Sequence, residues 1–395
     1  MQGNARSPWR SYFCHCLNQL QDNNLLRQLS TVSSPLSARI RIGDGDYLHF
    51  SSNDYLGLAT DPRLKDAAVK SLQQWGAGSG ASPLIVGHNA LYRELEEEIS
   101  DFKRAESALV FSSGYLANLG TISNLLAPED LILSDSLNHA SIVDGCRLAQ
   151  AKVRIYAHSD PGHLEELLQQ RPARGKVLVV TDSIFSMDGD IAPIPELYAL
   201  CQKYQALLYV DDAHGTGVMG DSGRGILEHF ELEEAEIVQL ATFSKALGSL
   251  GGFVAGQKLL IDYLINKART FIYSTALPPS VLAANIRALQ LIKEDPQPRQ
   301  SVNSLGLYLR KKFAEMGLHL TGSSPHLFSL VLGSNQRTVQ AYRFLLERGI
   351  YLPPIRPPTV PDGQSRLRIS LSTLHSLEDI DRLLDAISSF SAQGA

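Results

Sequence analysis

The stretch ATFSKALGSLGG, residues 241–252, places a single lysine, Lys245, among small, hydroxylic and apolar residues. The apolar run 237–243 predicts a buried strand, and the glycines that follow permit tight turns. A lysine at the end of a buried strand is costly unless its charge is paired or its pKa falls. Because a lysine with a lowered pKa forms Schiff bases, we predict covalent chemistry at Lys245. The alternative is a surface lysine in a loop.

Two more apolar runs end in polar loops. Residues 176–181 (KVLVVT) precede DSIFSMDGD, and residues 206–210 (ALLYV) precede DDAHGTG. Helical patterns alternate with these runs, which predicts an α/β fold with a mostly parallel central sheet flanked by helices. Ligands of such sheets bind beyond the carboxyl ends of the strands, so we expect these loops to meet in one site.

The rest of the chain is predicted to divide into three parts. Residues 1–50 form an arm with a helix over 17–29 and a hairpin within 39–50, residues 51–285 a large domain, and residues 286–395 a smaller α+β domain. The other helices are expected over residues 62–75, 91–103, 114–126, 161–170, 195–204, 258–269, 279–293, 300–316 and 339–348, with a last helix begun by the capping box of Ser376 and Asp379.

The string FSSGYLAN, residues 111–118, joins a predicted strand to a helix start through small residues. Free N–H groups of Gly114 and Tyr115, with the hydroxyls of Ser112 and Ser113, would point at a bound phosphate there. Neither a Walker loop nor GxGxxG is present, so this feature alone is a weak indication of phosphate binding.

These features together predict pyridoxal phosphate (PLP) as cofactor. Lys245 would meet its aldehyde and the FSSGYLAN turn its phosphate, while Asp211, at a predicted strand end, would keep its ring nitrogen protonated. His214, three residues after Asp211, could lie on the same side. His139 precedes a predicted helix, where a lone histidine is more often structural than functional.

Composition excludes several other classes of protein. The 395 residues carry a net charge of -5 without a basic tract, which argues against a nucleic-acid partner, and no apolar run approaches membrane-spanning length. No hydrophobic signal segment opens the sequence. The four cysteines form no disulfide framework, and Cys14 and Cys16 lack further nearby ligands for a metal. We therefore expect free thiols in a cytoplasmic protein without a bound metal.

Nearly the whole chain, from Arg27 to the last helix, resembles the α-oxoamine synthase family of PLP enzymes, which has fold type I. The matching strings are SSNDYLGL, FSSGYLAN, NHAS, FSMDGD, VDDAHGTG, TFSKALG and RLRIS. The strings FIYSTALPP and IRPPTVP are typical of members that serve biotin synthesis. The resemblance implies a homodimeric acyltransferase that condenses L-alanine with a pimeloyl thioester of coenzyme A or acyl carrier protein, releasing carbon dioxide and thiol.

The resemblance also implies roles for individual residues. Lys245 would bind PLP covalently and act as base, Asp211 would pair with the pyridine nitrogen, and His214 would pair with the ring hydroxyl. The other implied contacts are His139 on the ring face and the acyl carbonyl, Ser186 and Thr242 on the cofactor, Gly114 and Tyr115 on its phosphate, Ser274 and Thr275 on a partner subunit's phosphate, Arg368 on the amino-acid carboxylate, Thr359 along the substrate, and Arg27 on the distal pimeloyl carboxylate.

Three positions depart from the family pattern. Ser183 stands where glycine is usual, Tyr92 where histidine is common, and Ala81 where a second glycine is frequent. Two other functions stay open. One is a glycine C-acyltransferase of the same family, against which IRPPTVP and Arg27 argue. The other is a non-catalytic partner subunit, against which Lys245, Asp211 and His214 argue.

Overall fold

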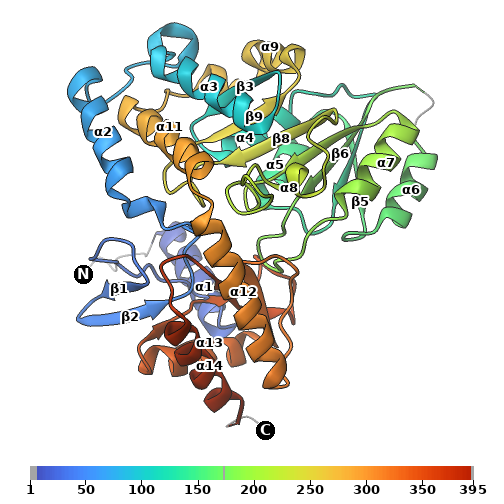
Figure 1. Ribbon diagram of the computed structural model, residues 1–395. Helices are drawn as coiled ribbons and strands as arrows, with labels where there is room; N and C mark the ends of the chain where they lie inside the picture. Colours follow the sequence, from blue (N-terminus) through green and yellow to red (C-terminus); the bar gives the residue numbers. More distant parts are fainter. Residues whose placement is uncertain (1–6, 172–173, 393–395) are drawn as a thin grey trace, which may run out of the picture.

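Seven strands form the central sheet of the computed structural model, which describes residues 7–171 and 174–392 (Figure 1). β8, β7, β6, β4 and β5 run parallel, and β9 pairs antiparallel with both β3 and β8. In spatial order the strands are β3 (Ser107–Phe111), β9 (Gly252–Gly256), β8 (Ile237–Thr242), β7 (Leu207–Asp211), β6 (Val177–Asp182), β4 (Leu131–Asp135) and β5 (Lys152–Tyr156). The predicted α/β class and mostly parallel sheet are therefore confirmed.

Helices cover both faces of this sheet because its inner strands are apolar on both sides. Every residue of β6 and β8 is buried. One face packs against α2 (Pro62–Trp75), α3 (Ala90–Lys103), α6 (Pro161–Gln169), α7 (Ile194–Tyr204), α8 (Ile226–His229) and α11 (Pro279–Glu294). The other packs against α4 (Gly114–Ile122), α5 (Ala140–Leu148), α9 (Lys258–Lys267) and α10 (Arg269–Ile272).

The N-terminal hairpin shares a core with the C-terminal region. β1 (Arg39–Ile42) and β2 (Gly45–His49) pair antiparallel as predicted, and β2 also pairs with β11 (Ile350–Tyr351). A second sheet contains β10 (Leu327–Gly333), β13 (Ser365–Ser370) and β12 (Pro354–Ile355). These sheets pack with α12 (Gln297–Glu315), α13 (Asn335–Glu347) and α14 (Leu377–Ala392) in the lower part of Figure 1.

α11 runs continuously across residue 285, and α12 continues from it toward this lower part (Figure 1). The division of the chain at residues 50 and 285 stays a prediction. No helix in the described ranges is both long enough and apolar enough to span a membrane.

Two predicted helices end earlier than expected. The N-terminal helix is α1 (Pro8–Asp22), and Asn24 then adopts a left-handed φ of 55°, so Arg27 is not helical. Asparagine tolerates this conformation and commonly ends helices. α4 ends at Ile122 because Ser123 Oγ and Asn124 Nδ2 bond back to carbonyls of its last turn, at 2.5 and 2.9 Å.

The sequence analysis missed β9 because its glycine-bounded sequence resembled a turn. A Cβ on Gly252 would lie 2.5 Å from both N and Cα of Gly114, so only glycine lets β9 pass this close to the start of α4. Local capping was predicted correctly. Asp61 accepts the Arg63 N–H at 2.8 Å at the start of α2. Ser376 and Asp379 form the reciprocal capping box of α14.

Candidate active site

Three polar strand ends meet at one edge of the central sheet. Asp182, Asp211 and Thr242 are the last residues of β6, β7 and β8. Asp182 lies opposite Asp211 in the parallel register, and Lys245 follows Thr242 by three residues. The polar loops therefore meet where the sequence predicted them to meet.

The surroundings of Lys245 favour the neutral form of its amine. Burial lowers the pKa of Lys245 from 10.5 to about 8, although the Asp211 and Asp182 carboxylates act in the opposite direction. No hydrogen bond joins Lys245 Nζ to another residue among those the structure describes. The lysine is therefore available for reaction instead of being held in an ion pair.

Both carboxylate oxygens of Asp211 are held. Oδ1 accepts the Ala213 N–H at 3.0 Å, and Oδ2 accepts Asn118 Nδ2 at 2.7 Å. The Tyr209 hydroxyl donates to Asn118 Oδ1 at 2.8 Å, which fixes the amide orientation. The sequence analysis did not identify Asn118, although it ends the string FSSGYLAN. Asp211 is thus oriented as a buried carboxylate that could face a cationic ring nitrogen.

The same amide connects Asp211 to His139. Asn118 Nδ2 also donates to Ser141 Oγ at 2.8 Å, and Ser141 Oγ lies 2.7 Å from His139 Nδ1. Because Nδ1 also accepts the Ser141 backbone N–H at 3.3 Å, the neutral ring carries its proton on Nε2. Burial lowers the pKa of His139, which keeps the ring neutral near pH 7.

Asp182 holds the backbone of His139. Its Oδ2 accepts the His139 N–H at 2.7 Å. Burial and the neighbouring Asp211 carboxylate raise the pKa of Asp182 well above its usual value. Asp182 therefore holds its proton more readily than an ordinary carboxyl group.

A second network joins His214 to Arg368. His214 Nδ1 lies 2.7 Å from the hydroxyl of Tyr55, which donates to Asn53 Oδ1 at 3.2 Å. Arg368 donates from Nη2 to the same Asn53 oxygen at 3.1 Å and from Nε to the Ser186 carbonyl at 2.5 Å. Arg368 Nη1 makes no hydrogen bond within the described ranges and can bind a carboxylate.

Burial favours the neutral form of His214 and of the neighbouring His326. Burial, with the Lys245 charge second, lowers the pKa of His214 well below its usual value. Burial likewise lowers the pKa of His326 to about 3. The Tyr55 ring packs edge-on against His326 at 4.3 Å. Among His214, His326 and Arg368, the positive charge is therefore on Arg368, which the Ser186 carbonyl and Asn53 hold in place.

The turn before α4 is capped by a serine, and its glycine leaves space beside β8. Ser113 caps α4 by accepting the Leu116 N–H at 3.2 Å, and Gly114 and Tyr115 begin the helix. A Cβ on Gly114 would lie 3.3 Å from Thr242 Cβ, so the glycine leaves room between the helix start and β8. These residues, with Lys245 and Asp211, fit the phosphate, aldehyde and ring nitrogen of PLP.

Arg27 and Thr359 lie together, apart from these networks. Arg27 Nη2 donates to the carbonyls of Arg356 and Pro357 at 3.3 and 3.0 Å, and the Thr359 N–H donates to the Arg356 carbonyl at 3.1 Å. Arg356 in turn donates to the carbonyls of Asn24 and Leu26. The sequence analysis did not single out Arg356.

The three residues that depart from the family pattern each make a hydrogen bond within the fold. The Tyr92 hydroxyl accepts the Leu277 N–H at 2.5 Å, and the Ala81 carbonyl accepts the Ala276 N–H at 3.0 Å. Both hold the segment that follows Ser274 and Thr275. The Ser183 hydroxyl donates to Asp212 Oδ1 at 2.8 Å.

Comparison with known proteins places this chain in a family. Residues 45–387 match the family described as aminotransferase class I and II. The 8-amino-7-oxononanoate synthase of Lysinibacillus sphaericus is 42% identical over 371 residues, covering 94% of this chain and 95% of that protein. The enzyme of the same name from Methylococcus capsulatus is 45% identical over 372 residues, covering 94% and 96%.

A solved structure extends the similarity to three dimensions. The S. paucimobilis serine palmitoyltransferase, solved with a bound PLP–myriocin aldimine, superposes with a TM-score of 0.92 at 28% identity. The superposition covers 98% of this chain and 99% of that one. From the matched sequence and fold together, the chain belongs to the aminotransferase class I and II family and, within it, to the 8-amino-7-oxononanoate synthases.

Proposed function

We propose that this protein is a PLP-dependent acyltransferase of biotin synthesis. It would condense L-alanine with a pimeloyl thioester to give 8-amino-7-oxononanoate, carbon dioxide and free thiol. The observation that carries the proposal is the lysine of lowered pKa, Lys245, near Asp211 and the partly free guanidinium of Arg368. The similar 8-amino-7-oxononanoate synthases support the choice of product.

Each residue of the site has a distinct task in this reaction. When bound, PLP would supply an aldehyde for amines and a ring that accepts the electrons left at the alanine Cα. Lys245 would bind the aldehyde and, once displaced by alanine, remove the Cα proton as a nearby base. Asp211 would keep the ring nitrogen protonated, and Arg368 Nη1 would hold the alanine carboxylate. His214 would contact the ring hydroxyl.

His139 has a proton available for the acyl group. Its Nδ1 accepts hydrogen bonds from Ser141, so Nε2–H is the donor that remains. A neutral imidazole on the ring face could donate this hydrogen to the thioester carbonyl while Cα attacks it. Gly114, Tyr115, Thr242 and Ser186 would contact the cofactor without taking part in proton transfer.

We expect covalent attachment of PLP to the unloaded protein to become faster as pH rises through about 8. Only the neutral amine attacks an aldehyde. At pH 7.5 a lysine of ordinary pKa is about 0.1% neutral, whereas a pKa of about 8 leaves about a quarter neutral. Stopped-flow absorbance between about pH 6.5 and 9.5 measures the rate. A rate still climbing steeply at the upper limit would contradict the lowered pKa.

Arg27 and Arg356, the arginine of IRPPTVP, form a pair that would bind the distal pimeloyl carboxylate. Burial and the charge of Arg27 both lower the pKa of Arg356, and its Nε has no hydrogen-bond partner among the described residues. No carboxylate of the described chain pairs with either guanidinium. A substrate carboxylate would complement these two charges.

We expect Arg27→Ala to raise KM for the pimeloyl thioester about 10- to 100-fold, because a hydrogen bond to a charged group contributes about 1.5–3 kcal/mol. The kcat value should change little, since the hydrogen bonds of Arg27 go to Arg356 and Pro357 and not to the residues around Lys245. A heptanoyl thioester, which lacks the distal carboxylate, is the control substrate and should be used equally well by both proteins. An equal loss with both thioesters would show that Arg27 does not bind the carboxylate.

Mass spectrometry of the product tests the function directly. PLP-loaded protein is incubated with L-alanine and pimeloyl-coenzyme A, and in parallel with glycine and acetyl-coenzyme A. Formation of 8-amino-7-oxononanoate only with the first pair is expected. Product only with the second pair would favour a glycine C-acyltransferase, and absence of both products and of PLP absorbance would favour a non-catalytic subunit.

We also propose that the active protein is a homodimer, with Ser274 and Thr275 reaching the phosphate bound by a partner subunit. Both residues follow α10 in a segment fixed by Tyr92 and Ala81. A cytoplasmic location stays a prediction from the cysteine content.

A further inference from the structure

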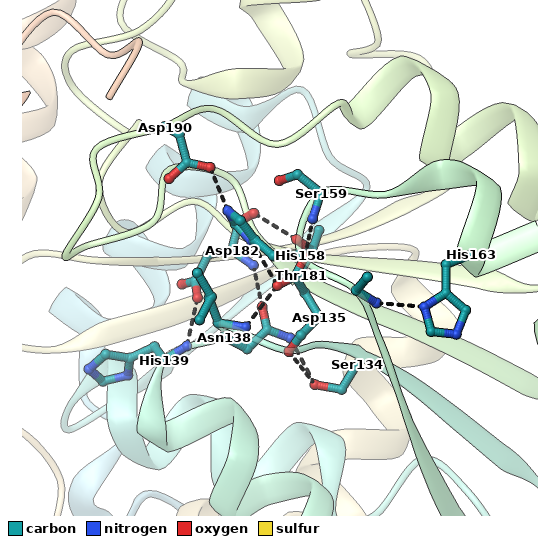
Figure 2. A network of polar contacts seen from close by, with 12 residues as sticks. Ser134, Asp135, Asn138, His139, His158, Ser159, His163, Thr181, Asp182 and Asp190 are labelled. Carbon is teal, nitrogen blue, oxygen red and sulfur yellow. Dashed lines mark hydrogen bonds and ion pairs between the residues drawn. The ribbon is translucent and has the colours of Figure 1, made fainter. Parts of the chain in front are cut away.

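His158 lies between two carboxylates at the edge of the sheet that carries the candidate active site. Its Nδ1 is 2.9 Å from Asp135 Oδ1, and its Nε2 is 2.8 Å from Asp190 Oδ2 (Figure 2). A neutral imidazole can donate from only one nitrogen, so two donated bonds require the charged ring. Burial would lower the pKa of His158, but the two carboxylates raise it to about 10. His158 is therefore a fixed cation between Asp135 and Asp190.

Asp135 anchors the turn that places His139. Besides His158, Asp135 accepts the Leu137 N–H and the Ser159 N–H, both at 2.8 Å, and its side chain is only 1% exposed. Within the same turn, Asn138 Oδ1 accepts the Asp182 N–H at 2.9 Å (Figure 2). Any displacement of Asp135 would move the start of this turn.

Asp190 closes the FSMDGD loop, residues 185–190, which lies on the other side of His158. The Phe185 N–H donates to the Asp190 carbonyl at 3.0 Å, and the Phe185 ring meets His158 edge-on at 4.4 Å. The next residue, Ser186, provides the carbonyl that accepts Arg368 Nε. His158 is thus separated from the proposed carboxylate-binding arginine by one loop.

The far side of the FSMDGD loop is held by the C-terminal region. The N–H groups of Ser323 and Ser324 donate to the Gly189 carbonyl at 3.0 and 2.8 Å, and Ser329 Oγ donates to the Met187 carbonyl at 2.5 Å. The loop is therefore held from two sides, and His158 provides an ionic contact from the side of the central sheet.

We infer that His158 is a positioning residue: through Asp135 and Asp190 it holds the FSMDGD loop at a fixed distance from the His139 turn, and so sets where Arg368 binds the amino-acid carboxylate. The inference rests on the proposed function of Arg368 as the alanine carboxylate site. It assigns His158 no contact with substrate or cofactor.

The first test is His158→Gln in PLP-loaded protein. Because one neutral amide replaces the doubly bonded cation, we expect the Kd for L-alanine, measured by spectral titration of the loaded enzyme, to rise at least about 5-fold. KM for L-alanine should rise in parallel, whereas KM for the thioester should stay within about twofold, since Arg27 bonds to Arg356 and Pro357 and not to His158 or its two carboxylates. A merely structural role would lower the thermal midpoint without separating the two substrates.

His163→Gln is the matched control. His163 lies on the same segment, and its ring accepts the Ala157 N–H at 3.0 Å (Figure 2). Among the described residues its side chain has no carboxylate partner, since only its backbone N–H meets one, that of Asp160 at 3.0 Å. The His163→Gln variant should leave the L-alanine Kd unchanged.

Asp190→Ala removes the second carboxylate while leaving the His158–Asp135 bond, and should raise the L-alanine Kd as His158→Gln does.

The double variant distinguishes the inference from additive damage. If His158 acts through Asp190, the effects of the two substitutions should not add. The Kd of the His158→Gln/Asp190→Ala protein for L-alanine should then equal the higher of the two single-variant values. Asp190→Ala also provides the test if His158→Gln fails to fold. If both single variants bind L-alanine with the Kd of the wild-type protein, the inference is wrong. The proposed function still stands in that case, provided that the wild-type protein forms the product. If the wild-type protein forms no product, the proposed function itself is refuted.

Discussion

Replacement of Lys245 by alanine should lower the rate of 8-amino-7-oxononanoate formation by at least about 10⁴-fold, because one side chain is both the covalent anchor and the base. Two tasks are lost together, and no other lysine lies on the same strand end. The PLP that remains should be bound without a covalent bond, through the Gly114 turn, Thr242 and Asp211. Borohydride reduction followed by peptide mass spectrometry should label wild-type Lys245 and leave the variant unlabelled.

Lys258→Ala is the control for this variant. Lys258 is 67% exposed, pairs with Asp262 at 2.9 Å, and lies at the start of α9. Its loss should change neither turnover nor the reduction product. Undiminished turnover in the Lys245 variant would remove the basis of the assignment, because no other residue of the site can replace a primary amine.

Replacement of Lys103 by methionine should lower the free energy of unfolding by about 3–5 kcal/mol, because it leaves a buried carboxylate unpaired. Lys103 Nζ donates to Asp212 Oδ2 at 3.0 Å, to Thr216 Oγ1 at 2.9 Å and to the Arg224 carbonyl. The lysine and aspartate side chains are only 1% and 3% exposed. Urea unfolding followed by circular dichroism of the loaded protein measures the loss.

Two further variants locate the cause of that loss. Lys293→Met removes a lysine that pairs with Glu98 and Asp101 but is 34% exposed, and should cost less than about 1 kcal/mol. Adding Asp212→Asn to Lys103→Met should recover part of the stability, because the uncompensated charge is removed with its partner. A loss equal to that of Lys293→Met would show that the buried pair is not a major contributor.

Lys103 and Lys245 show how the surroundings of a lysine decide what it does. Lys103 has three oxygen partners, and its charge is fully compensated. Lys245 has carboxylates nearby but no hydrogen bond within the described chain, and burial lowers its pKa. We therefore expect the first lysine to stabilise the fold and the second to react. The sequence singled out Lys245 through its neighbours in the chain, but Lys103 was unremarkable because its partners lie more than a hundred residues away.

The sequence by itself determined the features that depend on neighbouring residues. Apolar runs became buried strands because burial favours them wherever the sheet is covered, and Asp61, Ser376 and Asp379 capped helices because their partners lie two or three residues away. The order of polar strand ends also predicted the edge of the sheet at which Lys245 and Asp211 meet.

Only the tertiary structure decided the contacts between distant segments. Asn118 reaches Asp211 across 93 positions, and Arg27 reaches the Arg356 carbonyl across 329. The register of β9 and the place of His158 between two carboxylates likewise depend on how strands and loops pack. Such hydrogen bonds leave no periodic or local pattern in the chain, because their geometry is fixed only once the sheet and the C-terminal region come together.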